Sequence, residues 1–208
     1  MNGKLLMKLL LASLCAILLF GCKDNKSGES LEIISYYDQV AEGKENKPFA
    51  VVIWELYGQV KEDGSCILNI NDYREKPKFV SFKIKSEILD SVMNLIRSTR
   101  SDTAAYDTVK SGWYLYDGPQ IELIGPNSEN KKVSLRFLKS QRSNAICLRF
   151  YNYLDSVGRT CPPDNTIDTL AIVCDKKKLV DKKYLEAKSY VEKYWRPSIK
   201  FVAPKIPK

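Results

Sequence analysis

The chain has 208 residues, with 33 lysines and arginines against 25 aspartates and glutamates, and it contains no histidine. The absence of histidine excludes Ser–His and Cys–His nucleophile pairs, and it also excludes zinc, copper or haem held by histidine. Ser–Lys dyads, paired carboxylates and oxygen-ligand metal sites remain possible, but no motif in the sequence specifies a substrate, a metal or a cofactor.

The N-terminal segment reads MNGKLLMKLLLASLCAILLFGC, in which two lysines precede an apolar run over residues 9–20. That run is shorter than the roughly 18–20 residues that span a bilayer, so it indicates an export signal. Leu19 lies three residues before Cys22, and Gly21 directly precedes it, a pattern that resembles a bacterial lipoprotein signal peptide. The resemblance implies that residues 1–21 are removed and that Cys22 becomes the acylated first residue.

Two alternatives concern this signal. Cleavage before Cys15 would follow a bulky leucine and leave an apolar stub, and an ordinary secretory signal would make Cys22 incidental. Two or three acyl chains hold a protein durably at a membrane, so the resemblance implies a tethered protein that does not span the bilayer. The polar residues 22–30 then predict a flexible tether before a single globular domain over 31–208.

Lys23 follows the cysteine where an aspartate would favour retention at the inner membrane, so the resemblance implies the outer membrane. Lys23-Asp24 also partly resembles the tract that directs some Bacteroidota lipoproteins to the cell surface, but Asn25 and Lys26 interrupt the acidic run. The periplasmic face and the cell surface therefore both remain open.

The first half of the domain reads as one helix, three strands and a second helix. Residues 31–41 carry apolar side chains at helical spacing, and 49–57 are β-branched and aromatic. Asp63-Gly64 predicts a turn into a strand over 66–70. A strand over 79–84 precedes a helix that Ser86 caps, whose apolar stripe is Leu89, Val92, Met93 and Ile96.

The second half repeats the order of three strands followed by a helix. A strand over 113–116, a turn at Asp117-Gly118 and strands over 120–124 and 133–138 precede a helix that ends near Gly158, with the stripe Ile146, Phe150, Leu154 and Val157. VSFKIKS from Val80 resembles VSLRFLKS from Val133, which suggests a duplicated βββα unit, although chance similarity is the alternative. We therefore predict an α+β fold with antiparallel sheet packed against helices on one side.

The C-terminal part predicts a strand over 168–174 and a helix over 181–195 that ends before Pro197. Tyr184, Ala187, Val191 and Tyr194 are its predicted inward residues. Lysines cluster in DKKK and DKK, where a solvated helix face is favoured over contact with acidic phospholipid or glycan. Without the signal the balance is 31 basic to 25 acidic residues, and an envelope protein is not expected to bind nucleic acid.

Four cysteines follow Cys22, and they allow three disulfide pairings. A bridge between Cys161 and Cys174 is favoured because it closes a short loop, which contributes about 3 kcal/mol. Cys147 lies in an apolar helical stripe and is predicted to be a buried thiol or the partner of Cys66. No CxxC motif occurs, so a zinc ribbon is not expected.

Two aromatic clusters are candidate binding surfaces. Tyr114 and Tyr116 alternate with apolar residues on a predicted strand, and exposed neighbouring rings stack on sugars or anchor a protein partner. Trp195 with Arg196 has the composition of a protein interface. The alternatives are that other elements cover the tyrosines and that Trp195 packs at a helix end.

Glu55 and Glu122 are acids on predicted strands, and a pair of carboxylates across a cleft would indicate a hydrolase. The preferred interpretation is a lipid-anchored envelope protein that binds protein or glycan without catalysis. The alternatives are an inhibitor or immunity-type lipoprotein and a carboxylate-based envelope hydrolase. A cleft with two close acids would favour the enzyme, whereas a flat aromatic patch would favour binding.

Overall fold

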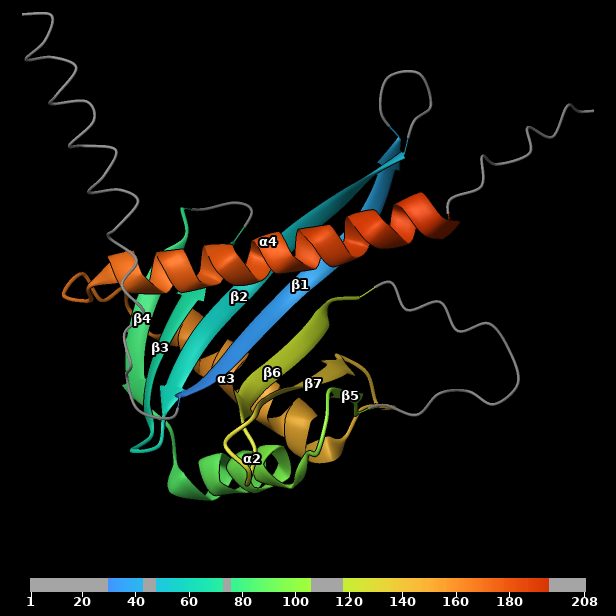
Figure 1. The fold of residues 1–208 in the computed structure, drawn as a ribbon. Helices are drawn as coiled ribbons and strands as arrows, with labels where there is room; N and C mark the ends of the chain where they lie inside the picture. Colours follow the sequence, from blue (N-terminus) through green and yellow to red (C-terminus); the bar gives the residue numbers. More distant parts are fainter. Residues whose placement is uncertain (1–29, 43–47, 73–75, 106–117, 195–208) are drawn as a thin grey trace, which may run out of the picture.

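The computed structural model describes residues 30–42, 48–72, 76–105 and 118–194 (Figure 1). Seven strands form one sheet in the order β4-β3-β2-β1-β6-β7-β5, and all neighbours are antiparallel except β5 and β7. The strands are β1 (Ser30–Glu42), β2 (Pro48–Lys61), β3 (Ser65–Ile70), β4 (Lys78–Lys83), β5 (Thr103–Ala104), β6 (Gln120–Pro126) and β7 (Lys132–Leu138). The helices are α2 (Ser86–Ser98), α3 (Ala145–Thr160) and α4 (Thr169–Tyr194). The predicted α+β class is confirmed.

Helices cover both faces of the sheet, so the prediction that they lie on one side is wrong. The larger core lies between the sheet and helices α2 and α3, where Leu68, Val92 and Phe150 are fully buried. A smaller core lies on the opposite face under α4 and includes Ile34 and Ile172. Figure 1 shows α4 running in front of β1 and β2, α3 behind the strands and α2 at the lower end of the sheet.

Residues 31–41 belong to strand β1, so the predicted helix is wrong. β1 lies in the middle of the sheet, and its side chains alternate between two buried faces. Ile33 packs in the core of α2 and α3, whereas Ile34 packs under α4. A strand that is buried on both faces has a nearly continuous apolar run. Such a run also contains apolar residues at helical spacing, so periodicity alone does not distinguish the strand from a helix.

The hairpin of β2 and β3 confirms the predicted turn. Gly64 has a φ of 86°, a left-handed conformation that favours glycine. The Asp63 carboxylate accepts hydrogen bonds from the backbone N–H and the hydroxyl of Ser65, both at 2.9 Å. These bonds lower the pKa of Asp63 and hold the turn that sets the register of the hairpin.

In chain order two strand–strand–helix units occur, β3-β4-α2 and β6-β7-α3. In space the helices do not stay with their own strands, because α2 packs on β6 and β7, whereas α3 contacts both β3 and β7. The predicted stripe of α2 is confirmed, since its four members are buried. Ser86 does not cap α2, because the capping position is Lys85, which makes no side-chain bond there. The segment 113–116 lies outside the described residues, so a full duplication stays a hypothesis.

Helix α4 begins at Thr169, so the strand predicted over 168–174 is wrong. The carboxylate of Asp168 accepts a hydrogen bond from the backbone N–H of Leu170 at 3.1 Å, which satisfies a free donor at the helix start. The inward position of Val191 is confirmed, but Tyr184 is 42% exposed. The β-branched run after Asp168 suggests a strand locally, and packing of Ile172 beneath the helix overrides it.

The outer edge of the sheet at β4 is covered by the segment that joins α3 to α4. The backbone N–H of Asp164 donates to the carbonyl of Phe79 at 2.8 Å, and the Ser81 hydroxyl donates to the Asp164 carboxylate. This carboxylate also accepts from the backbone N–H of Thr166 at 3.0 Å. These contacts occupy part of an edge that would otherwise be open to pairing with another chain.

Neither predicted disulfide is present, because Cys66, Cys147 and Cys161 are free thiols. Cys161 packs against the core of α2 and α3, whereas Cys174 belongs to α4 on the opposite face of the sheet. Cys147 lies in the first turn of α3. This helix contacts β3, the strand that carries Cys66, at Gly158, about three turns further along. The alternative prediction of a buried thiol at Cys147 is confirmed.

A charged groove beside helix α4

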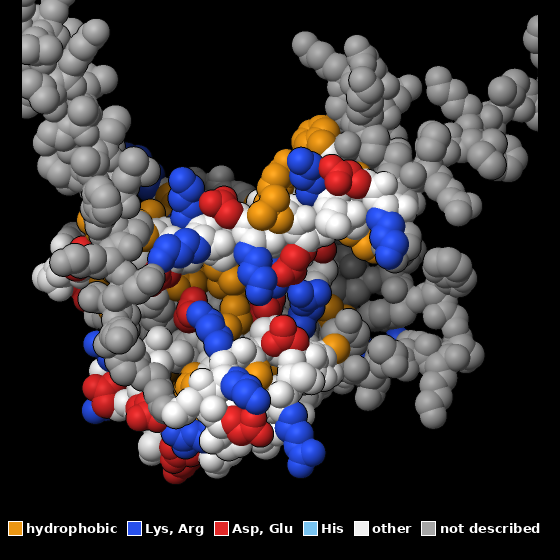
Figure 2. All heavy atoms as spheres, in the orientation of Figure 1, with side chains coloured by type: hydrophobic (Ala, Val, Ile, Leu, Met, Phe, Trp, Pro, Cys, Tyr) orange, Lys and Arg blue, Asp and Glu red, His pale blue; other side chains and the backbone are white. Residues whose placement is uncertain are grey.

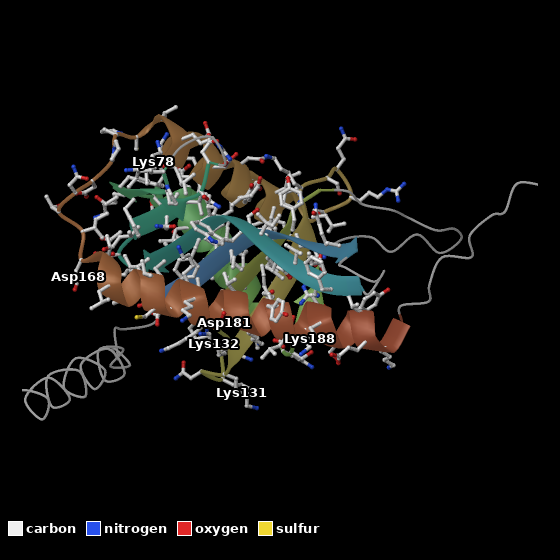
Figure 3. All side chains as sticks on the ribbon, turned by 90° about the horizontal axis from the view of Figure 1, so that it is seen from above. Lys78, Lys131, Lys132, Asp168, Asp181 and Lys188 are labelled. Atoms are coloured by element: carbon white, nitrogen blue, oxygen red, sulfur yellow. The ribbon has the colours of Figure 1, made fainter. Side chains whose placement is uncertain are left out.

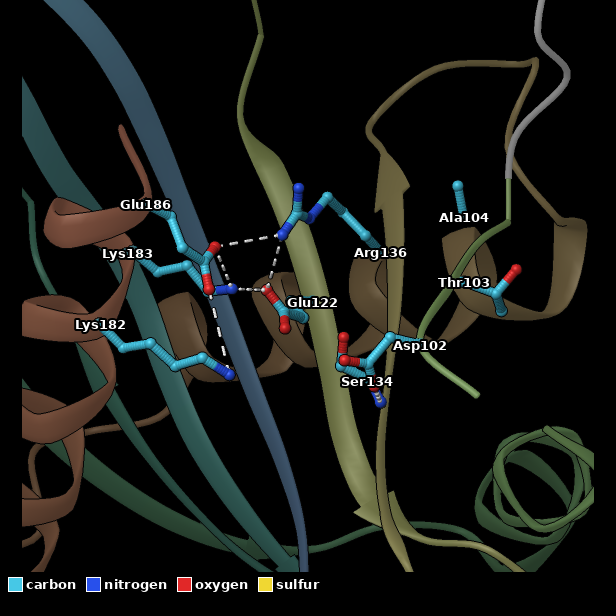
Figure 4. Close-up of a pocket in the computed structure, with 9 residues that line it drawn as sticks. All are labelled: Asp102, Thr103, Ala104, Glu122, Ser134, Arg136, Lys182, Lys183 and Glu186. Carbon is cyan, nitrogen blue, oxygen red and sulfur yellow. Dashed lines mark hydrogen bonds and ion pairs between the residues drawn. The ribbon is translucent and has the colours of Figure 1, made fainter. Parts of the chain in front are cut away.

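A groove of about 310 Å³ lies between α4 and the part of the sheet that α4 leaves uncovered (Figures 2 and 4). Helix α4 packs on β2 and β1, so the same face of β6, β7 and β5 is open beside it. Side chains from these three strands and from α4 line the groove: Asp102, Thr103, Ala104, Glu122, Ser134, Arg136, Lys182, Lys183 and Glu186. Three are acidic and three are basic.

The floor of the groove is polar because alternate residues of a strand share a face. On β6 the residues Ile121 and Leu123 point into the large core, and Glu122 between them points toward α4. On β7 the buried Leu135 similarly separates Ser134 from Arg136. The residues of these strands that face the large core are thus apolar, whereas Glu122, Ser134 and Arg136 make the floor of the groove polar.

A buried ion pair joins α4 to this floor. The Lys183 ammonium lies 2.5 Å from a carboxylate oxygen of Glu122, and the two side chains are only 2% and 1% exposed. Lys183 falls on the same helical stripe as Ile172 and Leu179, which face the small core. Its aliphatic stem therefore lies along the sheet, and its charge meets the one carboxylate beneath it.

Two further residues extend the pair into a network, drawn in Figure 4. Lys183 Nζ also contacts Glu186 Oε2 at 3.1 Å, and Arg136 Nη2 lies 3.4 Å from the same oxygen. Arg136 Nη2 is 3.9 Å from Glu122. The groove thus brings the carboxylates of Glu122 and Glu186 close together. The cations of Lys183 and Arg136 contact both, and they occupy the space that a substrate bond between the two acids would need.

The rim of the groove carries charges that water can reach. Asp102 accepts a hydrogen bond from the backbone N–H of Ser134 at 2.8 Å, which fixes the acid at the β5 side. Lys182 stands on the α4 side, 4.0 Å from Glu186 Oε1, with its side chain 63% exposed. A bound molecule therefore meets Asp102 on one side and the pair of Lys182 and Glu186 on the other.

Polar contacts continue beneath the N-terminal half of α4. Lys176 Nζ lies 3.8 Å from the centre of the Trp54 ring and donates to Asn69 Oδ1 at 3.2 Å. Burial lowers the pKa of Lys176. Gln59 Nε2 donates to Asp175 at 3.1 Å and to the Tyr57 hydroxyl at 3.0 Å. Much of the interface of α4 with the sheet is therefore polar.

The two acids predicted from the sequence as a catalytic pair lie on opposite faces of the sheet. Glu55 is the extra residue of a β-bulge opposite Ser35, whose hydroxyl donates to it at 3.4 Å. Glu55 interacts electrostatically with Tyr151 of α3, while Glu122 contacts Lys183 of α4. With the sheet between them, they cannot act on one substrate bond.

Burial also raises the pKa of the two core thiols: that of Cys147 rises to about 12, and that of Cys66 rises further. A thiol that stays protonated is a poor nucleophile, so neither is a candidate for covalent catalysis. No cluster of three or more cysteines, aspartates or glutamates among the described residues is arranged to hold a metal ion.

The predicted binding residues Tyr114, Tyr116 and Trp195 and the lipidation residue Cys22 lie outside the described residues. The sequence interpretation missed Lys183, because the lysine clusters were predicted to be solvated. The available signal was the spacing of Lys183 from Ile172 and Leu179, which requires that residues 169–180 be recognised as helix.

Comparisons with protein-family models, with characterised proteins and with solved structures found no match. Within the described residues, no helix has both the length and the apolar character that crossing a bilayer requires.

Proposed function

We propose that this protein is a lipid-anchored binding protein of a bacterial cell envelope, acylated at Cys22. Its groove binds a polypeptide segment of a partner and is not catalytic. The observation that carries the proposal is the groove beside α4, which is walled on both sides and lined by charges of both signs. The anchor rests on the signal-peptide pattern, and the outer membrane is the proposed location.

The lining favours a polypeptide over a sugar. Backbone and side chains of a polypeptide offer donors, acceptors and charges of both signs, which match Asp102 on one wall and Lys182 on the other. Sugar rings bind well on exposed aromatic faces, and no described lining residue is aromatic. Hydrolysis through Glu122 and Glu186 is disfavoured, because the ammonium of Lys183 contacts both carboxylates.

The test is site-specific photo-cross-linking in living cells, with a benzophenone amino acid at Thr103 in the groove. The matched control is Asn94, an exposed residue of α2 behind the sheet. We expect a polypeptide adduct at Thr103 that Asn94 does not give. A carbohydrate adduct at Thr103 would show instead that the groove binds a glycan. If the captured protein is an enzyme or a toxin, the domain is an inhibitor or immunity-type lipoprotein. Equal adducts at both positions would refute the proposal.

A further inference from the structure

The outer face of α4 carries exposed apolar side chains along its length. Leu170 and Leu185, near its two ends, are 60% and 62% exposed, and Val173 and Tyr184 are also exposed. Residues 170, 173, 177, 181, 184 and 188 follow one another at helical spacing, so they form a single stripe opposite the buried one. We call this stripe, together with Leu185, the α4 crest.

Lysines outnumber acids on and beside the crest, although Lys131, Lys132 and Lys188 are ion-paired with Glu129, Glu32 and Glu192. Helix α4 contains seven lysines and four acids, and Lys177 and Lys188 lie on the crest itself, with Asp181 as its acid. Figure 3 places Lys131 and Lys132, at the turn between β6 and β7, on the same side of the sheet as α4. An apolar stripe flanked by lysines is the composition of helices that lie on anionic membrane surfaces.

The chain enters the domain on this same face. Glu32 of β1 accepts a hydrogen bond from the Tyr57 hydroxyl, and Gln59 bridges that hydroxyl to Asp175 of α4. Ser30, two residues before Glu32, therefore lies near the N-terminal half of α4. Residues 22–29 can reach at most about 29 Å when fully extended, so an acyl group on Cys22 keeps this face close to the bilayer.

We infer that the α4 crest rests on the anionic membrane that holds the acyl anchor. This inference rests on the proposed acylation of Cys22. A helix is about 10 Å across, so a bilayer on the crest leaves a slot of about that height over β6 and β7. The slot admits an extended polypeptide but not a folded domain, and the groove therefore takes segments that lie along the membrane surface.

The experiment places a benzophenone amino acid at Leu185 on the crest or at Asp90, an exposed residue of α2 on the opposite face. The full-length protein is irradiated in cells and its adducts are identified by mass spectrometry. We expect phospholipid adducts at Leu185 in several-fold excess over Asp90. The substitution Lys177→Ala should weaken membrane contact by up to about fivefold, the contribution of one lysine at an anionic surface.

The mass of the N-terminal peptide from the same preparation separates the two proposals. With Cys22 acylated, equal lipid adducts at Leu185 and Asp90, or protein adducts at Leu185, overturn the inference and leave the anchored groove intact. An unacylated Cys22 overturns both the anchor and the inference. Thermal unfolding of each labelled protein shows that the exposed replacements leave the fold unchanged.

Discussion

The substitution Lys183→Met removes the cation that neutralises Glu122. The Glu122 carboxylate is 1% exposed, so the variant would leave a buried charge whose nearest other cation is Arg136 at 3.9 Å. Breaking a buried pair by removing one partner costs about 3–5 kcal/mol, and Arg136 should keep the loss near the lower end. For a domain of this size a loss of about 3–5 kcal/mol corresponds to a fall in melting temperature of roughly 6–20 °C.

The assay is urea unfolding followed by circular dichroism, with Lys188→Met as the control on the exposed side of the same helix. The control should change the free energy of unfolding by less than about 0.5 kcal/mol. The double variant Glu122→Leu with Lys183→Met should recover most of the loss, since it leaves no buried charge. A Lys183→Met variant as stable as Lys188→Met would show that the ion pair does not fasten α4 to the sheet.

Three further predictions concern other parts of the fold. Gly58→Ala should cost about 1–3 kcal/mol in urea unfolding, because its new Cβ would lie 2.4 Å from a leucine side chain of β3; an unchanged midpoint would contradict this packing. Hydrogen bonds lower the pKa of Asp164, so its stabilising effect is present above about pH 4 and is lost as the pH falls further. Asp164→Asn should therefore be less stable than the natural protein at pH 7, and the difference between the urea midpoints should shrink as the pH falls below about 4; a constant difference would contradict the assignment. In the native protein iodoacetamide should modify Cys161, whereas Cys66 and Cys147 should react only in urea; equal labelling of all three without urea would show that the core is open.

Local patterns predict the parts of this fold that bury one face. The stripe of α2 and the turn at Asp63-Gly64 follow from side-chain spacing and turn chemistry, and both are confirmed. β1 is buried on both faces, and its nearly continuous apolar run no longer distinguishes a strand from a helix. The prediction for the start of α4 failed for a related reason, because its β-branched residues are typical of a strand but pack against the sheet as part of a helix.

The groove is harder to predict than the fold, because its residues are far apart in the sequence. Lys182 and Lys183 are adjacent in a lysine cluster, yet Lys182 is exposed while Lys183 is buried against Glu122. Helical spacing places Lys183, and not Lys182, on the stripe of Ile172 and Leu179, but this spacing can be used only once residues 169–194 are recognised as one helix. The same holds for Glu55 and Glu122, which a β-bulge and strand alternation direct to opposite faces.

The most direct measurement of ligand binding in the groove compares the Thr103 cross-link in cells that carry Lys182→Glu with that in cells that carry Lys177→Glu. Both substitutions reverse one exposed charge on α4, but only Lys182 lines the groove. We predict that Lys182→Glu reduces the polypeptide adduct at Thr103 several-fold and that Lys177→Glu reduces it less. An adduct that Lys182→Glu leaves unchanged would contradict a ligand held between α4 and the open strands.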